Sequence, residues 1–107
     1  MAWRISAGKT QGPEYSWWLY AGNGEQVAWA GETFPSQHNA GRAAAAFKIG
    51  SATARYEVFA DAAGEYRWRA WRGSEKVAAS GEAFASKYNA ERAAETVRLN
   101  AWAAEGP

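Results

Sequence analysis

The stretch VAWAGETF at residues 27–34 returns as VAASGEAF at residues 77–84. Each copy is followed by a similar stretch, SQHNAGRAA from Ser36 and SKYNAERAA from Ser86. Farther upstream, the letters EYSW in the first half match EYRW in the second half. Internal similarity at a period of about 50 residues indicates that one supersecondary unit is used twice. The repeat therefore predicts the architecture before any propensity is considered.

The length and composition indicate one globular domain over residues 1–107, made of two repeats at about 1–52 and 53–107. Twelve basic and 11 acidic residues give a net charge of +1, which provides no strong attraction to nucleic acid or to an anionic membrane. The chain has no cysteine, which excludes disulfides and cysteine nucleophiles. No signal peptide or membrane-spanning run is recognisable, so we expect a cytoplasmic protein.

Alternating residues and turn signals predict three strands in each repeat. The expected strands are residues 3–5, 15–20 and 26–30 in the first repeat, and residues 55–60, 66–72 and 77–80 in the second. Residues 7–14 contain two glycines and a proline and are expected to form a loop. Asn23-Gly24 predicts a type I′ hairpin turn, because both central positions of that turn need positive φ.

Each repeat is predicted to end in a helix, from Ser36 to about Ile49 and from Ser86 to about Asn100, with the serines as N-caps. Both helices carry an apolar stripe at helical spacing, formed by Ala40, Ala43, Ala44 and Phe47 and by Ala90, Ala93, Ala94 and Val97. The fold class predicted is α+β. Two tandem β-β-β-α(-β) repeats form one antiparallel sheet with two helices on one face, in pseudo-twofold arrangement.

The sheet face turned away from the helices is expected to be aromatic and basic. Tyr66, Trp68 and Ala70 alternate with the other residues of their strand and match apolar residues of the first repeat, so this set is assigned to the core. The opposite face then carries the predicted binding residues, which are Trp18, Tyr20, Arg67, Arg69 and Trp71. Arginine can contact phosphate or carboxylate groups, and aromatic rings offer stacking surfaces. An ordinary solvent face with arginine stems lying over rings is the simplest alternative.

The sequence resembles the YegP-like family of small bacterial proteins of unknown function. The resemblance is carried by YEVF at 56–59, AGEYRWR at 63–69, GE-x-F at 81–84 and SKYNA at 86–90. The first repeat matches more loosely, through AGNGE at 21–25 and residues 36–44. Together these matches extend over nearly the whole chain.

The resemblance implies two β-β-β-α-β units that build a single antiparallel sheet, either in tandem or as a dimer of single units. It also implies that the strand after each helix is exchanged to the other half. Residues 53–61 would then form one long strand, and Ala101-Trp102-Ala103 would form the matching final strand. The resemblance implies no established activity and carries over no catalytic residue.

Other polar residues are weak candidates for chemistry. His38 is the only histidine, and a histidine-based metal site needs further ligands nearby. Glu32 and Glu82 occupy equivalent positions, and a pseudo-twofold axis could bring two carboxylates together for acid–base work, although turn chemistry explains them equally. Trp102 is expected to dock on the sheet. We therefore expect no catalytic residue, metal or cofactor.

These observations favour a non-enzymatic interaction module that binds a protein partner through the aromatic and basic face. Single-stranded nucleic-acid binding by the same face is the alternative, and a small enzyme is a third. The chain is expected to be a monomer with internal pseudo-dimer symmetry, with further association through sheet edges left open. The sequence does not identify the partner.

Overall fold

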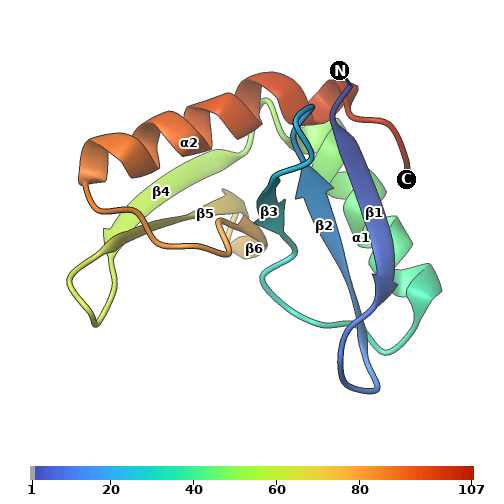
Figure 1. Ribbon diagram of the computed structural model, residues 1–107. Coiled ribbons are helices and arrows are strands. Elements are labelled where there is room, and N and C mark those ends of the chain that lie inside the picture. The colour runs from blue at the N-terminus through green and yellow to red at the C-terminus, as the bar shows by residue number, and fades with distance from the viewer. Residues whose placement is uncertain (1) are drawn as a thin grey trace.

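The computed structural model describes residues 2–107 as six strands and two helices around one sheet (Figure 1). The first half contains β1 (Arg4–Lys9), β2 (Tyr15–Tyr20), β3 (Gln26–Trp29) and α1 (Gln37–Gly50). The second half contains β4 (Arg55–Ala60), β5 (Tyr66–Arg72), β6 (Glu75–Ala79) and α2 (Lys87–Asn100), and a 3₁₀ turn follows at Ala101–Ala103. Among residues 2–107, no helix is long and apolar enough to cross a bilayer.

The sheet is open and antiparallel, with strand order β1-β2-β3-β6-β5-β4. Each half is a three-stranded meander, and the two halves meet where β3 pairs with β6 through Trp29 and Ala79. Helix α1 packs on β1 and β2, and α2 packs on β4 and β5, so both helices cover the same face (Figure 1). The predicted α+β class with one antiparallel sheet and two helices on one face is confirmed, and the matching element order agrees with a repeat.

Both predicted helix caps are present. The Ser36 hydroxyl accepts a hydrogen bond from the backbone N–H of Asn39 at 3.1 Å, and Ser86 accepts one from Asn89 at 3.0 Å. Each bond satisfies one of the N–H groups that the first helical turn leaves without a partner. The helices begin directly after these serines, as the sequence predicted.

The core lies between the helices and the sheet. Trp17 of β2 stacks on Phe47 of α1 with ring centroids 5.0 Å apart, and both side chains are buried. In the second half, Trp68 packs against Tyr56 at 5.6 Å. The Tyr56 hydroxyl donates to the carbonyl of Ser51 at 2.8 Å, and burial raises the pKa of Tyr56. Small alanines on both helices allow the large rings of the sheet to fill the space between the layers.

Two expectations about the first half are wrong. Strand β1 runs to Lys9, not to residue 5, because Ala7 pairs with Trp17 and Lys9 with Tyr15, so that the ladder holds residues expected to be loop. The turn at Asn23-Gly24 is not type I′, since Gly24 alone has positive φ, at 86°. The Asn23 side chain instead accepts a hydrogen bond from the Glu25 N–H at 3.0 Å, which is the side-chain turn that asparagine commonly forms.

The strand expected after α1 is present but shorter than predicted, and the strand expected after α2 is absent from the described residues. The segment after α1 leads into β4, which has six residues and is shorter than the strand expected at residues 53–61. Strand β4 pairs with β5 in the second half. After α2, Ala101–Ala103 is a 3₁₀ turn and not the expected strand. Trp102 does not dock on the sheet, since it is 61% exposed.

The end of the chain pairs with the outer edge of β1. Glu105 forms a parallel bridge with Arg4, its carbonyl accepts from Ile5 N at 2.8 Å, and its N–H donates to Trp3 O at 2.8 Å. Lys48 of α1 donates to two carbonyls of this tail. The position that a strand after α2 would take by symmetry with β4 is held by β1 itself. The tail therefore lies beside β1 and contributes a single bridge.

The contact between Trp17 and Phe47 generates a stability prediction. Phe47→Ala removes a buried ring and leaves a cavity under Trp17, and it should lower the free energy of unfolding by about 3 to 5 kcal/mol. Ile49→Ala is the matched control on the same helix, because Ile49 is 83% exposed, and it should change stability by less than about 0.5 kcal/mol. Urea unfolding followed by circular dichroism measures both. Equal effects would contradict the assignment of Phe47 to the core.

Candidate functional site

All five predicted binding residues lie on the sheet face opposite the helices. In β2 and β5 they alternate with buried residues such as Trp17 and Trp68, whose side chains face α1 and α2. None is fully exposed, and each is partly covered by neighbours. They fall into two groups on the two halves of the sheet. The members are Trp18 and Tyr20 on β2, and Arg67, Arg69 and Trp71 on β5.

Glu57 of β4 organises the second group. It pairs with Arg69 across the two strands, and its Oε1 accepts from Arg69 Nε at 2.8 Å and from Trp71 Nε1 at 3.0 Å. The Arg69 guanidinium also lies over the Phe59 ring, 4.1 Å from its centroid. One carboxylate thus orients two of the predicted binding side chains. Alternation in β4 places Glu57 on the open face with Arg55 and Phe59, and the period-two pattern of residues 55–60 is the sequence signal for this placement.

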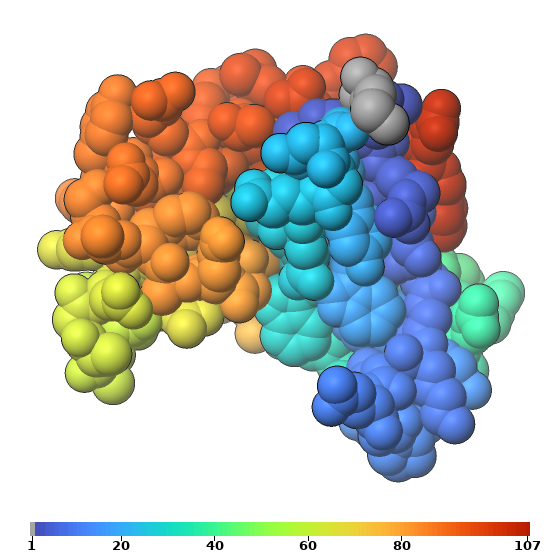
Figure 2. Space-filling view, viewed as in Figure 1, coloured from blue at the N-terminus to red at the C-terminus, as the bar shows by residue number. Residues whose placement is uncertain are grey.

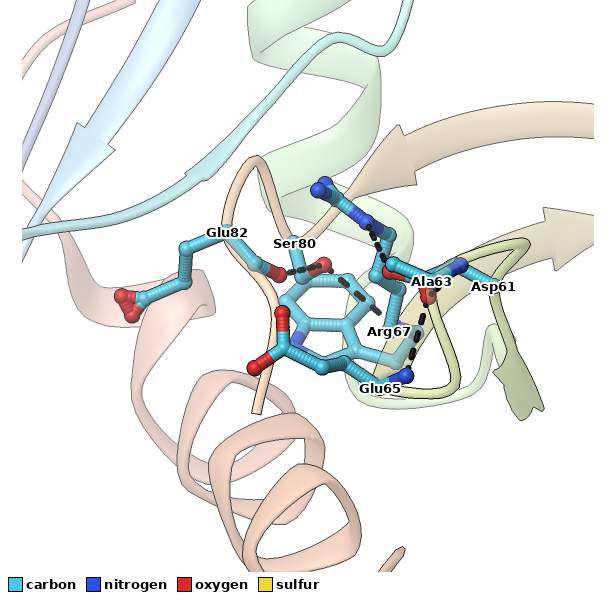
Figure 3. A network of polar contacts seen from close by, with 7 residues as sticks. Asp61, Ala63, Glu65, Arg67, Ser80 and Glu82 are labelled. Carbon is cyan, nitrogen blue, oxygen red and sulfur yellow. Dashed lines mark hydrogen bonds and ion pairs between the residues drawn. The ribbon is translucent and has the colours of Figure 1, made fainter. Parts of the chain in front are cut away.

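Arg67 has a similar carboxylate partner in Asp61. Its Nε donates to Asp61 Oδ2 at 3.1 Å, while Asp61 Oδ1 accepts from the N–H groups of Ala63 and Glu65 at 2.9 Å each. Figure 3 shows this arrangement, in which the turn holds the carboxylate and the carboxylate holds the arginine. The terminal nitrogens of Arg67 point away from Asp61 in the same view. The turn therefore fixes the direction in which this arginine presents its free donors.

Both carboxyl groups are ionised at neutral pH, and their hydrogen bonds lower the pKa of each further. The bond from Arg69, followed by the bond from Trp71, holds the pKa of Glu57 below its ordinary value. The pKa of Asp61 is lowered most by the N–H of Glu65, with Arg67 adding to the effect. Each arginine consequently stands beside a negative charge, and this half of the face is much less positive than its arginines alone would suggest.

The first group is arranged around aromatic side chains. The Arg4 guanidinium lies over the Tyr20 ring, 4.4 Å from its centroid, and Trp18 is paired across the strands with Trp29. Ser16, two residues before Trp18 in β2, is buried, and its hydroxyl donates to the carbonyl of Glu32 at 2.9 Å. This half of the face is therefore aromatic, with one cation at its margin.

The remaining candidates from the sequence are separate from this face. His38 is an exposed residue of α1, and Glu32 and Glu82 are exposed beyond β3 and β6. The backbone carbonyl of Glu82 accepts from the Ser80 hydroxyl at 2.8 Å, as that of Glu32 accepts from Ser16. Within residues 2–107, no group of three or more His, Asp or Glu side chains is placed to hold a metal ion.

A groove lies between the two halves on the open face, and we call it the seam groove. It has a volume of about 350 Å³. Its lining residues from the first half include Gln26, Trp29 and Gly31. Those from the second half include Phe59, Arg67, Arg69, Lys76, Ala79, Ser80 and Gly81. Two of the five predicted residues, Arg67 and Arg69, therefore border a concave surface. This surface is not evident from the sequence, because the positions on β3 and β6 come together only in the folded sheet.

The carboxylate of Glu57 generates a pH prediction. Because its folded-state pKa is lowered, its bonds to Arg69 and Trp71 should persist at neutral pH and be lost only as the pH falls through that lowered value. The Trp71 indole N–H resonance should therefore shift on acidification, with a midpoint below the ordinary value of 4.5. Two-dimensional ¹H–¹⁵N NMR follows the titration. Glu57→Gln should abolish it, and an unchanged titration in that variant would contradict the assignment.

No protein-family model and no curated protein sequence matches the chain. Two solution NMR structures share its fold. A UPF0339 protein from Shewanella oneidensis superposes with a TM-score of 0.78 at 17% identity, covering 95% of this chain and 86% of its own. The protein yegP of unknown function from E. coli superposes with a TM-score of 0.80 at 21% identity, covering 97% of this chain and 90% of its own.

The agreement in fold supports the resemblance carried by the sequence motifs, which implied one sheet with helices on one face. The chain therefore has the fold of the YegP-like proteins, whose E. coli representative is itself of unknown function.

Proposed function

We propose that the protein is a non-enzymatic interaction module that binds a protein partner through the open face of its sheet. The observation that carries the proposal is the fixed Arg–Trp arrangement around Glu57, in which one carboxylate holds both Arg69 and Trp71. Tryptophan, tyrosine and arginine are the residues that dominate binding energy at protein interfaces. Side chains held in place before binding lose less conformational entropy when a partner arrives.

The charge of the face favours a protein over single-stranded nucleic acid. Binding to phosphates draws on cations whose counterions are released, and here Arg67 and Arg69 already stand beside Asp61 and Glu57. The net charge of +1 adds little to the attraction. Aromatic side chains such as Trp18 could still stack on bases, and nuclease treatment distinguishes a nucleic acid from a protein partner.

The proposal extends to the setting of the protein. We expect the module to act as a monomer in a bacterial cytoplasm, with the internal pseudo-twofold in place of a dimer. Edge strand β4 remains available for further association, whereas the tail at Glu105 covers one end of β1.

Affinity capture with matched tryptophan variants tests the proposed function. A tagged wild-type protein is incubated with native bacterial lysate, one half of which is treated with nuclease. The partner should remain after nuclease treatment, and its recovery should fall about tenfold or more with Trp71→Ala, because a central interface tryptophan contributes a large share of binding energy. Trp18→Ala tests the other half of the face in the same way.

Trp102→Ala is the control, because Trp102 is an exposed tryptophan outside the sheet and should leave recovery unchanged. Circular dichroism confirms that all variants are folded. Loss of the partner on nuclease treatment would move the assignment to nucleic acid. Full recovery with both Trp18→Ala and Trp71→Ala would reject the open face as the binding surface.

A further inference from the structure

The seam groove exists because the two repeats differ at one cross-strand pair. In the first half, Trp18 of β2 pairs with Trp29 of β3. At the equivalent place in the second half, Arg69 of β5 pairs with Ala79 of β6. A methyl group thus stands where the first repeat has an indole. Ala79 therefore fills less of the groove than a tryptophan would, and the Trp29 ring forms one wall of the groove.

Three cationic side chains line the groove, and two of them, Arg67 and Arg69, are paired with carboxylates. Arg67 and Arg69 meet their carboxylates through Nε, which leaves the two terminal nitrogens of each guanidinium for other contacts. Lys76 donates to the carbonyl of Gly31 at 3.0 Å, and within residues 2–107 no carboxylate lies within ion-pair distance of its ammonium group. The charge of Lys76 is therefore not balanced locally.

Two glycine turns keep the groove in this shape. Gly31 and Gly81 have φ of 79° and 75°, values that other residues rarely adopt. A Cβ on Gly31 would lie 3.2 Å from Lys76 Cε, and one on Gly81 would lie 3.1 Å from Trp29 Cδ1. Each turn therefore lets a groove side chain from the other half lie close over its backbone. The cation and the aromatic wall are positioned from opposite repeats.

We propose that the seam groove binds a small organic anion, a carboxylate or phosphate monoester carried on a flat apolar body. The anionic group accepts hydrogen bonds from Lys76 and from the terminal nitrogens of Arg67 and Arg69, which suit planar or tetrahedral oxyanions. The apolar body lies over Ala79 against the Trp29 ring. A volume of about 350 Å³ accommodates one small ligand. This site goes beyond the proposed protein binding. It shares Arg67 and Arg69 with that face, and the two proposals are tested with different variants and probes.

The test is an NMR titration with defined probes. Uniformly ¹⁵N-labelled protein is titrated with 3-phenylpropionate, with phenyl phosphate, and with the uncharged 3-phenylpropionamide. The two anions should shift the backbone amides of Gly31, Ala79 and Gly81 and the indole N–H of Trp29. The amide should bind about tenfold more weakly or not measurably, because it lacks the charge that strengthens the hydrogen bonds. The stronger of the two anions identifies the oxyanion that the groove prefers.

Lys76→Gln is the decisive variant, because it places in the second repeat the residue that the first repeat has at Gln26. It should weaken binding of the anions about tenfold, and Arg67→Gln should do the same. Arg92→Gln is the control, since it removes one positive charge from the exposed surface of α2 and should leave affinity unchanged.

The spectra of the variants show directly whether each is folded. Absence of any shift with either anion, shifts outside the groove only, or equal binding of the acid and its amide would each overturn the proposal. Unchanged affinity in folded Lys76→Gln and Arg67→Gln would do so as well.

Discussion

The joint between β3 and β6 is the constraint on which the rest of the structure depends. Only Trp29 and Ala79 form a ladder pair there among the described strands, because the chain turns away at Gly31 and Gly81 directly afterwards. Such a short ladder is supported by contacts across the seam. Lys76 reaches the carbonyl of Gly31, α1 contacts β6 of the second half, and α2 contacts β3 of the first half. The two meanders can therefore meet at an open angle, with the loops around 10–14 and 61–64 projecting from separate halves (Figure 2).

The two halves share a backbone plan but carry different chemistry on the open face. The first half presents Trp18, Tyr20 and Trp29, and the second presents arginines held by Glu57 and Asp61. A symmetric molecule would offer the same surface twice. Here the halves differ along β2 and β5 and also at the joint, where Trp29 of the first half faces Ala79 of the second, so the two halves offer unlike surfaces. This is a simple route by which a duplicated unit acquires an asymmetric binding surface.

Much of this arrangement could be predicted from local sequence. Ser36 and Ser86 mark the helix starts because capping is a short-range interaction, and alternation assigns Trp18 and Arg69 to the open face because side chains in a strand have a period of two. The partners of the arginines could not be predicted in the same way. Glu57 meets Arg69 only through the register between two strands, and register depends on the turn that joins them.

The failures of prediction have related causes. Residues 7–9 look like loop when taken alone, but they are held in β1 by their pairing with strand β2. Asn23 favours a turn, yet its side chain selects a different turn from the one expected. The missing final strand after α2 has a topological cause, since β1 already occupies the place it would take. The length of β1 and the missing final strand depend on distant segments of the chain, whereas the turn at Asn23 is a local choice between two turn types.

The tail beside β1 has a consequence for how the chain could be connected. Because Glu105 N–H donates to Trp3 O, the two ends of the described chain lie side by side, and Figure 1 shows them at the same corner. Joining the two ends would therefore close the backbone into a ring. The ring would contain two similar links between a helix and a strand, and the chain is open at the link from α2 to β1. The other link runs from Gly50 to Arg55. A circularly permuted chain that starts at Arg55, with the present ends joined, would have the same strand neighbours throughout the sheet.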